Sequence, residues 1–286
     1  MKRVIFVFMA GTLFAWNGTF NTEMYDPRSL ALGGACVALP TISAGVILNP
    51  AVAGYFRGKE FIASYGRFRD FPVRNGLLGY TVEDNGVAAG GLFWHYTGFK
   101  VYDTYDWSEN QISYAVAKKI GWHFSLGLSL KLLFVSSDFE NGKASGTAAD
   151  VGFLGDINQI FFYGMSVVNA VSRLNWDTGR KEKLQTGVIS GFSIVFNRLN
   201  LGVQLKFSGE FEYVSSGLEV WLARDVLALR LGGKYHLVEP SRLVPTGGLS
   251  VAVPAGKSNI SAEFGFLYDE KVTGFIERLG IRVFRF

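Results

Sequence analysis

The stretch FSLGLSLKLLF, residues 124–134, decides the fold because its side chains alternate strictly between two kinds. One face carries only large apolar side chains, namely Phe124, Leu126, Leu128, Leu130, Leu132 and Phe134. The opposite face is mainly small and polar, with Ser125, Gly127, Ser129, Lys131 and Leu133. Because successive side chains of a β-strand point to opposite faces, this pattern predicts a strand with one apolar and one polar side.

The same alternation recurs in residues 199–208 and 259–268, and it extends over most of the chain after residue 60. The polar faces hold mostly Gly, Ser, Asn and Gln with few charges, whereas a soluble sandwich needs charged residues on its outer face. Aromatic residues stand near segment ends, as Trp94, Trp107 and Trp122 do. The pattern favours a wall with a lipid-facing apolar side, interfacial aromatic residues and a polar interior.

Segments of this kind number about fourteen, which predicts an all-β fold, a transmembrane antiparallel β-barrel over residues 59–286. They lie near residues 60–67, 76–83, 86–96, 109–118, 122–135, 147–156, 160–170, 184–196, 199–209, 214–223, 226–236, 246–253, 258–268 and 274–286. Tight connections such as 83–86 and 197–198 alternate with longer ones such as 97–108 and 171–183. This alternation is typical of an even-stranded barrel with short periplasmic turns and longer external loops.

Both ends of the chain carry export signals. Residues 1–15 combine a basic start, an apolar run and a small residue at Ala15, which is the layout of a secretory signal peptide. The chain ends on Phe286 with a second aromatic residue two places earlier, and this ending is similar to the signal that the barrel assembly machinery recognises. We therefore expect a protein of the bacterial outer membrane, in contact with outer-membrane lipid and, during biogenesis, with that machinery.

Residues 26–54 fit neither strand alternation nor a charged amphipathic helix. They are rich in small residues, and the paired Gly33 and Gly34 allow a tight turn or a close approach to another part of the chain. Asn49 and Pro50 mark a second turn, because proline biases the residue before it toward an extended or turn conformation. We expect this segment to fold compactly as a hatch, or plug, inside the barrel lumen. An irregular first pair of barrel strands is the alternative.

Two short runs in this segment, GGACVAL at residues 33–39 and NPAVAG at residues 49–54, resemble the N-terminal hatch of FadL-type outer-membrane transporters and of their PorV/PorQ-like relatives. The resemblance implies that residues 16–58 hold a hatch that blocks the lumen. It also implies that a hydrophobic small molecule, such as a hydrophobic carboxylate, is captured outside, held beside the hatch and released through a wall opening into the bilayer. The positions that match the hatch and would border a ligand are Gly33, Gly34, Asn49 and Pro50.

Several charged residues have the strand parity of the lumen side, and charges inside a narrow barrel must be paired or hydrated. They are Lys131, Lys206, Arg230, Lys234 and His236, with Glu219 and Glu263 as acidic partners. Two roles are open to them, since they could meet the carboxylate of a ligand in transit or hold the hatch to the wall. For the second role, Asp26 and Arg28 are the natural counterparts within the hatch.

The sequence gives no support to an enzyme. Its three histidines are scattered without metal-ligand spacing, and neither a Gly-x-Ser-x-Gly elbow nor a Gly-x-Gly-x-x-Gly motif occurs. The single cysteine, Cys36, excludes an intramolecular disulfide and predicts a buried apolar role. The net charge of +4 includes two cations of the signal peptide, so it needs no nucleic-acid partner. We expect no cofactor, no metal and no catalytic residue.

Two functions from different classes fit these observations. The first is uptake of hydrophobic small molecules through a hatch-plugged barrel with lateral release, as in FadL-type transporters. The second is a PorV/PorQ-like outer-membrane scaffold that transports nothing and serves protein secretion or surface attachment. A ligand-sized apolar pocket with one cationic residue between hatch and wall would favour uptake. A lumen filled by side chains would favour the scaffold.

Overall fold

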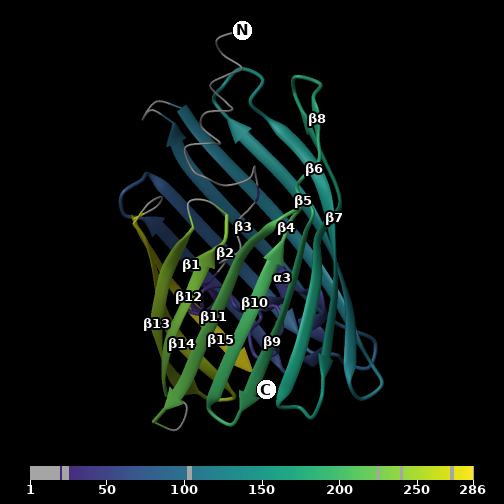
Figure 1. Cartoon of the computed structure of the whole chain (residues 1–286), viewed down its shortest axis with the longest axis vertical. Coiled ribbons are helices and arrows are strands. Elements are labelled where there is room, and N and C mark those ends of the chain that lie inside the picture. The colour runs from purple at the N-terminus through teal and green to yellow at the C-terminus, as the bar shows by residue number, and fades with distance from the viewer. Residues whose placement is uncertain are drawn as a thin grey trace.

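A computed structural model describes residues 20, 26–101, 105–223, 226–238, 241–270 and 274–285 of the chain. Within these residues, fourteen long strands form one closed antiparallel sheet, in which each strand pairs with its neighbours along the chain and the last pairs with the first (Figure 1). They are β1 (Lys59–Phe68), β2 (Val73–Val82), β3 (Ala89–Val101), β4 (Tyr105–Ile120), β5 (Phe124–Ser137), β6 (Ala144–Asp156), β7 (Phe161–Trp176), β9 (Gly187–Phe196), β10 (Leu199–Phe207), β11 (Phe211–Leu222), β12 (Leu227–His236), β13 (Arg242–Ala255), β14 (Ser258–Asp269) and β15 (Gly274–Arg285). The two-residue β8 (Lys181–Glu182) pairs with β7 in the connection to β9. The predicted fourteen-stranded antiparallel barrel is confirmed.

The two faces of the wall differ as the alternation predicts. In β5, Leu126, Leu128 and Leu130 are 46%, 42% and 57% exposed on the outer surface, whereas Ser125 and Ser129 are buried on the lumen side. Strands β10 and β14 repeat this alternation. Because the closed ladder pairs the backbone groups of neighbouring strands, a wall with this apolar outer surface fits hydrocarbon surroundings.

The strands on one side of the barrel are longer than the sequence predicts. The connection expected at residues 97–108 is mostly strand, since β3 continues to Val101 and β4 begins at Tyr105. Phe99 and Trp107 are register partners there, and their rings stack with centroids 6.1 Å apart. Such a cross-strand aromatic pair stabilises a hairpin beyond the point at which turn residues suggest its end. Strands β3–β7 rise above the rest of the barrel as a taller wall (Figure 1).

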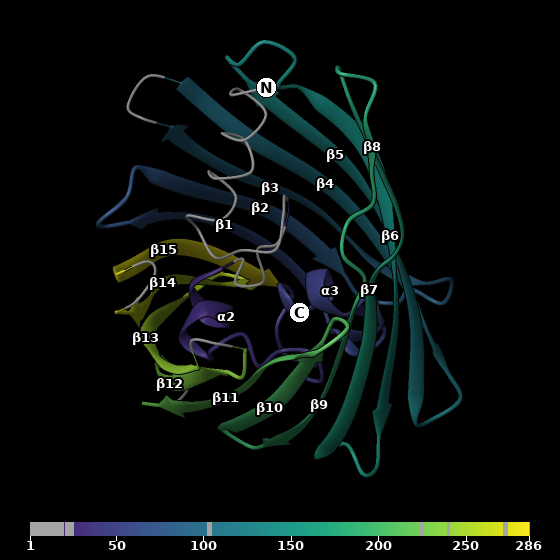
Figure 2. The same cartoon turned by 45° about the horizontal axis from the view of Figure 1, so that its top comes forward.

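Residues 26–56, called here the inner segment, lie within the ring of strands (Figure 2). They form α2 (Pro27–Ala31), α3 (Gly45–Leu48) and the 3₁₀-helix η1 (Pro50–Tyr55). These short helices exclude the alternative of a first pair of barrel strands. Every residue from 26 to 53 is buried except Thr41. None of the helices among the described residues is long and apolar enough to cross a membrane.

Local sequence accounts for the shape of the inner segment. Asp26 begins α2 through a capping box with Ser29, in which each side chain accepts a hydrogen bond from the backbone N–H of the other residue, at 2.7 and 3.1 Å. The chain then turns at Gly33 and Gly34, whose φ angles of 64° and 82° are favourable for glycine. The turn predicted from these glycines is therefore where the segment leaves its first helix.

The largest apolar cluster joins the inner segment to one half of the wall. From the inner segment it includes Val37, Ile47 and Val52, all buried. From the wall it includes the inward side chains Ile62, Leu77, Ala89, Phe93, Ala115, Ala117, Leu154, Phe162 and Ile189. Burial of apolar surface is the dominant favourable contribution to such packing. This main cluster therefore fastens the inner segment to strands β1–β4, β6, β7 and β9.

Candidate functional site

Opposite the main cluster, buried charges of alternating sign follow the lumen side of the wall. We call this row the charge girdle, and its members are Glu219 of β11, Arg230 of β12, Glu263 of β14, Arg282 of β15 and Glu60 of β1. Arg230 Nε lies 2.6 Å from Glu219 Oε2, and Arg230 Nη2 lies 3.4 Å from Glu263 Oε1. Arg282 contacts Glu263, and its Nη1 lies 3.9 Å from Glu60 Oε2. Each buried charge therefore has an opposite charge beside it, as burial demands.

The inner segment contacts the charge girdle at the girdle's two ends, Glu219 and Glu60. Arg28 donates through Nε and Nη2 to the two carboxylate oxygens of Glu219, at 2.8 and 2.6 Å. Ser43 donates to the carboxylate of Glu60. The bidentate geometry makes the Arg28 contact both strong and directional. Asp26 has another use than the predicted pairing with the wall, because its side chain accepts from the backbone of Ser29 at 2.7 Å and caps α2.

Ten inward glycines bring the wall backbone against the inner segment, one on each consecutive strand from β5 to β7 and from β9 to β15. This glycine belt consists of Gly127, Gly152, Gly164, Gly191, Gly202, Gly217, Gly232, Gly248, Gly265 and Gly280. A Cβ on any of them would come within 3.0 Å of an atom of the inner segment. At Gly127 those atoms belong to the backbone of Pro50 and Ala51, which cannot swing aside. The inner segment therefore fits against these ten strands because their glycines have no side chain at the points of contact.

The glycine belt predicts a local effect of a single methyl group. Gly127→Ala forces the 3₁₀-helix η1 away from β5, because overpacking costs about 1–3 kcal/mol. Faster amide hydrogen exchange in peptides covering residues 45–56 is the expected result, measured by mass spectrometry in detergent. Gly76→Ala is the matched control, since its nearest neighbour atom lies 3.9 Å away and belongs to the wall. Equal exchange in the two variants would contradict the tight fit.

The side chain of Asn49 connects two stretches of the inner segment with the barrel wall. Its Nδ2 donates to Val37 O at 2.7 Å and to Phe153 O of β6 at 3.0 Å, and its Oδ1 accepts from Ala51 N at 3.1 Å. The side chain is fully buried, so these bonds are shielded from water. Pro50 follows as the first residue of η1, a position that needs no amide donor. Asn49 therefore fixes the second turn of the inner segment to the wall.

The three predicted lumen lysines have partners within the wall, and the ring of the predicted His236 lies 6.3 Å from that of Tyr213. Lys131 Nζ lies 2.6 Å from Asp150 Oδ2, and Lys206 Nζ lies 2.9 Å from Glu212 Oε2. Lys234 lies over the ring of Tyr213, 3.8 Å from its centroid. The partners Asp150, Glu212 and Tyr213 were missed from the sequence. Strand parity predicts the face of a residue, but the neighbour across the sheet depends on the register of the strands.

A second apolar cluster lies higher, on the lumen side of the taller wall. This mouth cluster consists of Trp107, Leu133, Val135, Ala144, Ala148, Leu174 and Leu184, with Phe20, Phe99, Phe139 and Trp176 packed against it. Trp107 was expected in the outer aromatic band, and this was wrong. Its side chain is only 9% exposed, because it shares the inward parity of Gln111 and Ala115 on β4. Composition identified the aromatic residue, but not the face on which it lies.

The Lys131–Asp150 pair separates the two apolar clusters. Along β6 the inward side chains include Ala148 of the mouth cluster, Asp150, and Leu154 of the main cluster. Asp150 also accepts a hydrogen bond from the backbone amide of Asn169 at 2.7 Å. Asn169 has a φ angle of 52°, and the register of β6 with β7 shifts at the same level. The ion pair therefore braces an irregular point of the wall.

Beside this point, β7 and the chain that precedes β9 are joined by side chains. The regular β7–β9 ladder ends at the pair Val168 and Gly187. Beyond it, Ser172 Oγ accepts from Leu184 N at 2.9 Å and donates to Leu184 O at 3.3 Å. Asn169 Nδ2 donates to Gln185 O at 3.2 Å, and Thr186 Oγ1 donates to Asn169 O at 2.9 Å. We call these residues the seam; Leu184 and Leu174 of the mouth cluster lie at it.

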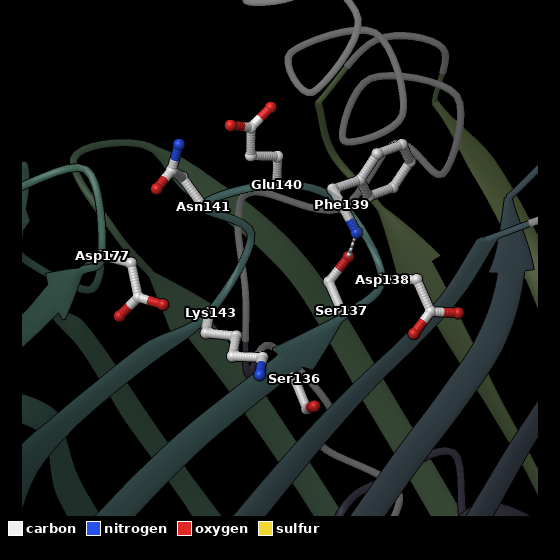
Figure 3. A pocket seen from close by; sticks show the side chains of 8 residues that line it. All are labelled: Ser136, Ser137, Asp138, Phe139, Glu140, Asn141, Lys143 and Asp177. Carbon is white, nitrogen blue, oxygen red and sulfur yellow. Dashed lines mark hydrogen bonds between the residues drawn. The ribbon is translucent and has the colours of Figure 1, made fainter.

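A pocket of about 440 Å³ lies at the outer end of the β5–β6 hairpin (Figure 3). Its lining residues are Ser136, Ser137, Asp138, Phe139, Glu140, Asn141, Lys143 and Asp177. The dashed line in Figure 3 is the hydrogen bond from Phe139 N to Ser137 Oγ, whose atoms lie 3.1 Å apart. This bond stabilises the turn. With its charged lining and its place at the loop tip, this pocket is not the ligand-sized apolar pocket between hatch and wall that would favour uptake over the scaffold.

Solved structures provide the comparison with known proteins. The CymD monoaromatic hydrocarbon channel aligns with a TM-score of 0.72 and 12% identity, over 94% of this chain and 99% of its own. The chain has a FadL-type barrel fold. The Ralstonia pickettii toluene transporter TbuX gives 0.65 at 12% identity, over 94% and 100%, and a Pseudomonas aeruginosa FadL homologue gives 0.65 at 12%, over 92% and 98%. Neither a family model nor a curated protein matches the chain.

In this FadL-type barrel the residues predicted from the sequence form separate groups. Gly33, Gly34, Asn49 and Pro50 lie on the inner segment, and Gly33 approaches the backbone of Gly233 in β12. Arg230 and Glu263 meet within the charge girdle. Lys131, Lys206 and Lys234 stand in three other pairings of the wall. The signal peptide predicted at residues 1–15 and the terminal Phe286 lie outside the described residues.

Proposed function

We propose that this protein is a channel of the bacterial outer membrane that takes up hydrophobic small molecules. Residues 1–15 act as its signal peptide, residues 16–58 contain a hatch that closes the lumen, and residues 59–286 form the barrel. The observation that carries the proposal is the apolar inner side of β4–β7, where the mouth cluster lies above the main cluster. An apolar molecule entering there meets the mouth cluster first. A polar level with Gln111 and Ser113 of β4 and the neutralised Lys131–Asp150 pair separates it from the main cluster around the hatch.

The FadL-type fold supports this proposal, because the aligned structures include channels for monoaromatic hydrocarbons and toluene. The exposed apolar side chains of the strands fit outer-membrane lipid on the other side of the wall. Among the described residues, no group of three or more His, Cys, Asp or Glu could hold a metal ion. In this function the protein lets a molecule pass without changing it chemically and uses no cofactor.

Lateral release is the second part of the proposal, and the seam is the place for it. Elsewhere in the wall, opening would break several backbone bonds of a regular ladder. At the seam, four side-chain bonds replace the ladder, and each contributes about 0.5–1.5 kcal/mol. Leu174 and Leu184 place the mouth cluster directly behind it. A bound apolar molecule moves from the mouth cluster into lipid through this gap, which lies between the end of the β7–β9 ladder and the two-residue pairing of β7 with β8.

A PorV/PorQ-like scaffold is the other candidate, and the filled lower lumen favours it. The inner segment is buried almost throughout, and at the glycine belt it approaches ten of the strands too closely to admit a side chain. For a scaffold the loops at the barrel rim would be the working surface. The two functions differ in one measurable property, the passage of small molecules.

Uptake of labelled toluene by intact cells tests the proposal. Cells with the wild-type protein should accumulate toluene faster than cells without it, at equal amounts of folded barrel measured by heat-modifiable migration. Asn49→Leu should change that rate, because losing the buried bonds to Val37 and Phe153 costs about 1–3 kcal/mol and loosens the hatch. If neither toluene, p-cresol nor a long-chain carboxylate enters faster with the protein present, the scaffold is the better reading.

A further inference from the structure

The mouth cluster contains a set of aromatic rings with ordered geometry. The rings of Trp107 and Trp176 lie with centroids 6.0 Å apart, at an angle of 40°. Phe99 stacks on Trp107 from the other strand of the β3–β4 hairpin. These rings come from β3, β4 and β7, so the taller wall holds them in place from three strands. Rigid aromatic side chains of this kind offer apolar contact at a low entropic cost.

Each indole in the cluster is bonded to a carboxylate. Trp107 Nε1 donates to Glu109 Oε1 at 3.1 Å, and Trp176 Nε1 donates to Glu182 Oε2 at 2.9 Å. These bonds fix the orientation of both rings, because an indole has one N–H to donate. They also place acceptor oxygens at the edge of an apolar site. The second oxygen of Glu109 remains for another donor.

Phe20 takes that acceptor. Its ring packs against the mouth cluster, and its backbone N–H donates to Glu109 Oε2 at 2.9 Å. The site therefore holds an aromatic ring and a hydrogen-bond donor together. Phe20 makes both contacts. A small molecule with an aromatic ring and a hydrogen-bond donor could make the same two contacts in its place.

We propose that Phe99, Trp107, Glu109, Trp176 and Glu182 form a binding site for uncharged aromatic compounds that carry a hydrogen-bond donor, such as phenols, and that Phe20 competes for it. The hydroxyl of a phenol replaces the Phe20 N–H at Glu109 Oε2, and its ring replaces the Phe20 ring. This site deepens the proposed uptake function and rests on it for its role in the cell. Binding itself does not depend on transport.

The charges of the site select against a carboxylate ligand. Glu182 is paired with Arg180, whose Nη2 lies 3.8 Å from Glu182 Oε2, so the acid that would meet the ligand is Glu109. An aromatic carboxylate in the place of Phe20 would set its oxygens against the Glu109 oxygen that now accepts from an N–H donor. Deeper in the lumen, Lys131 is neutralised by Asp150. The ligand of this site is therefore a neutral aromatic compound with a hydrogen-bond donor, and not the hydrophobic carboxylate expected from the sequence.

Three probes that share a methylbenzene ring test this selection. Binding of labelled toluene, p-cresol and p-toluate to the purified mature protein in detergent is measured by equilibrium dialysis, with protein-free micelles as the blank. The wild type should bind p-cresol about tenfold more tightly than toluene, since a bond to a charged acceptor is worth about 1.4 kcal/mol or more. It should bind p-toluate more weakly than toluene.

Variants separate the parts of the site. Phe20→Ala should tighten binding of p-cresol and toluene by a similar factor, because it removes the competing ring and leaves the backbone N–H at Glu109 in place for both ligands. Phe196→Ala, at an exposed phenylalanine of β9, is the matched control and should change neither. Glu109→Gln should reduce the preference for p-cresol over toluene and improve binding of p-toluate. Trp107→Leu should weaken all three, and heat-modifiable migration verifies that each barrel is folded.

Equal binding of p-cresol and toluene by the wild type would overturn the assignment of Glu109. Unchanged or weaker p-cresol binding in Phe20→Ala would overturn the competition. Tightest binding of p-toluate would overturn the charge argument. The uptake assay fails or succeeds separately from these results. Binding as expected without uptake rejects the channel and keeps the site, whereas uptake of toluene without the expected binding pattern rejects the site and keeps the channel.

Discussion

Deleting residues 26–54 should convert the closed barrel into an ion-conducting pore. The backbone ladder runs from strand to strand and closes through β1 and β15 without using the inner segment. The barrel can therefore insert when that segment is missing. Barrels of eight strands are filled by their side chains, whereas those of 16–18 strands leave an aqueous channel. A fourteen-stranded wall with a belt of inward glycines lies near the open end of that range.

Single-channel recording in planar bilayers measures the effect. We expect the deleted protein to conduct at least about tenfold more than the wild type, because ten strands present only a glycine where the inner segment lies, and its removal leaves that space open. Deleting Glu140 and Asn141 is the control, since both are exposed at the tip of the β5–β6 connection and neither belongs to the mouth cluster. It should leave the wild-type conductance unchanged. A folded deletion variant that stays closed would show that the inner segment is not the plug.

The strands could be predicted well because a lipid-facing wall imposes a strict period of two. In β10 the side chains of Leu199, Leu201 and Val203 are exposed, and those of Asn200 and Gln204 are buried, as the alternation requires. A shift of one residue would turn every apolar side chain inward, so the register of the pattern is strongly constrained. Strand ends in the taller wall were harder to predict. They depend on cross-strand aromatic contacts that no single segment reveals.

The contents of the lumen could be predicted only in part. Arg28 was expected to meet an acid of the wall, because a buried arginine needs one, and Glu219 is that acid. Asp26 was assigned the same task, although an aspartate before a proline also begins helices and here does so. The mouth cluster was missed, since its rings come from strands whose neighbours are set by the register. Asp150 was the one partner that the inward parity of β6 could have indicated.

Closing the seam with a disulfide should stop uptake. Ser172 and Leu184 face each other across it, with two hydrogen bonds between the serine hydroxyl and the leucine backbone. The side-chain hydrogen bonds that hold the wall at the seam are worth about 2–6 kcal/mol in total. A disulfide between cysteines at these two positions replaces them with a covalent bond that thermal motion does not break. If molecules leave through the seam, oxidation of Ser172→Cys/Leu184→Cys should reduce toluene uptake to the level of cells without the protein. Reduction should restore it.

The native Cys36 does not interfere with this experiment. It is fully buried in the inner segment, and burial raises the pKa of its thiol, so little thiolate forms to exchange with the new disulfide. A second cysteine pair at Leu201 and Leu218, register partners on the outer faces of β10 and β11, crosses a regular ladder and serves as the control. Oxidation of that pair should leave uptake intact. Uptake that persists in the oxidised seam variant, with cross-linking verified by mass spectrometry, would place the exit elsewhere in the wall or past the inner segment.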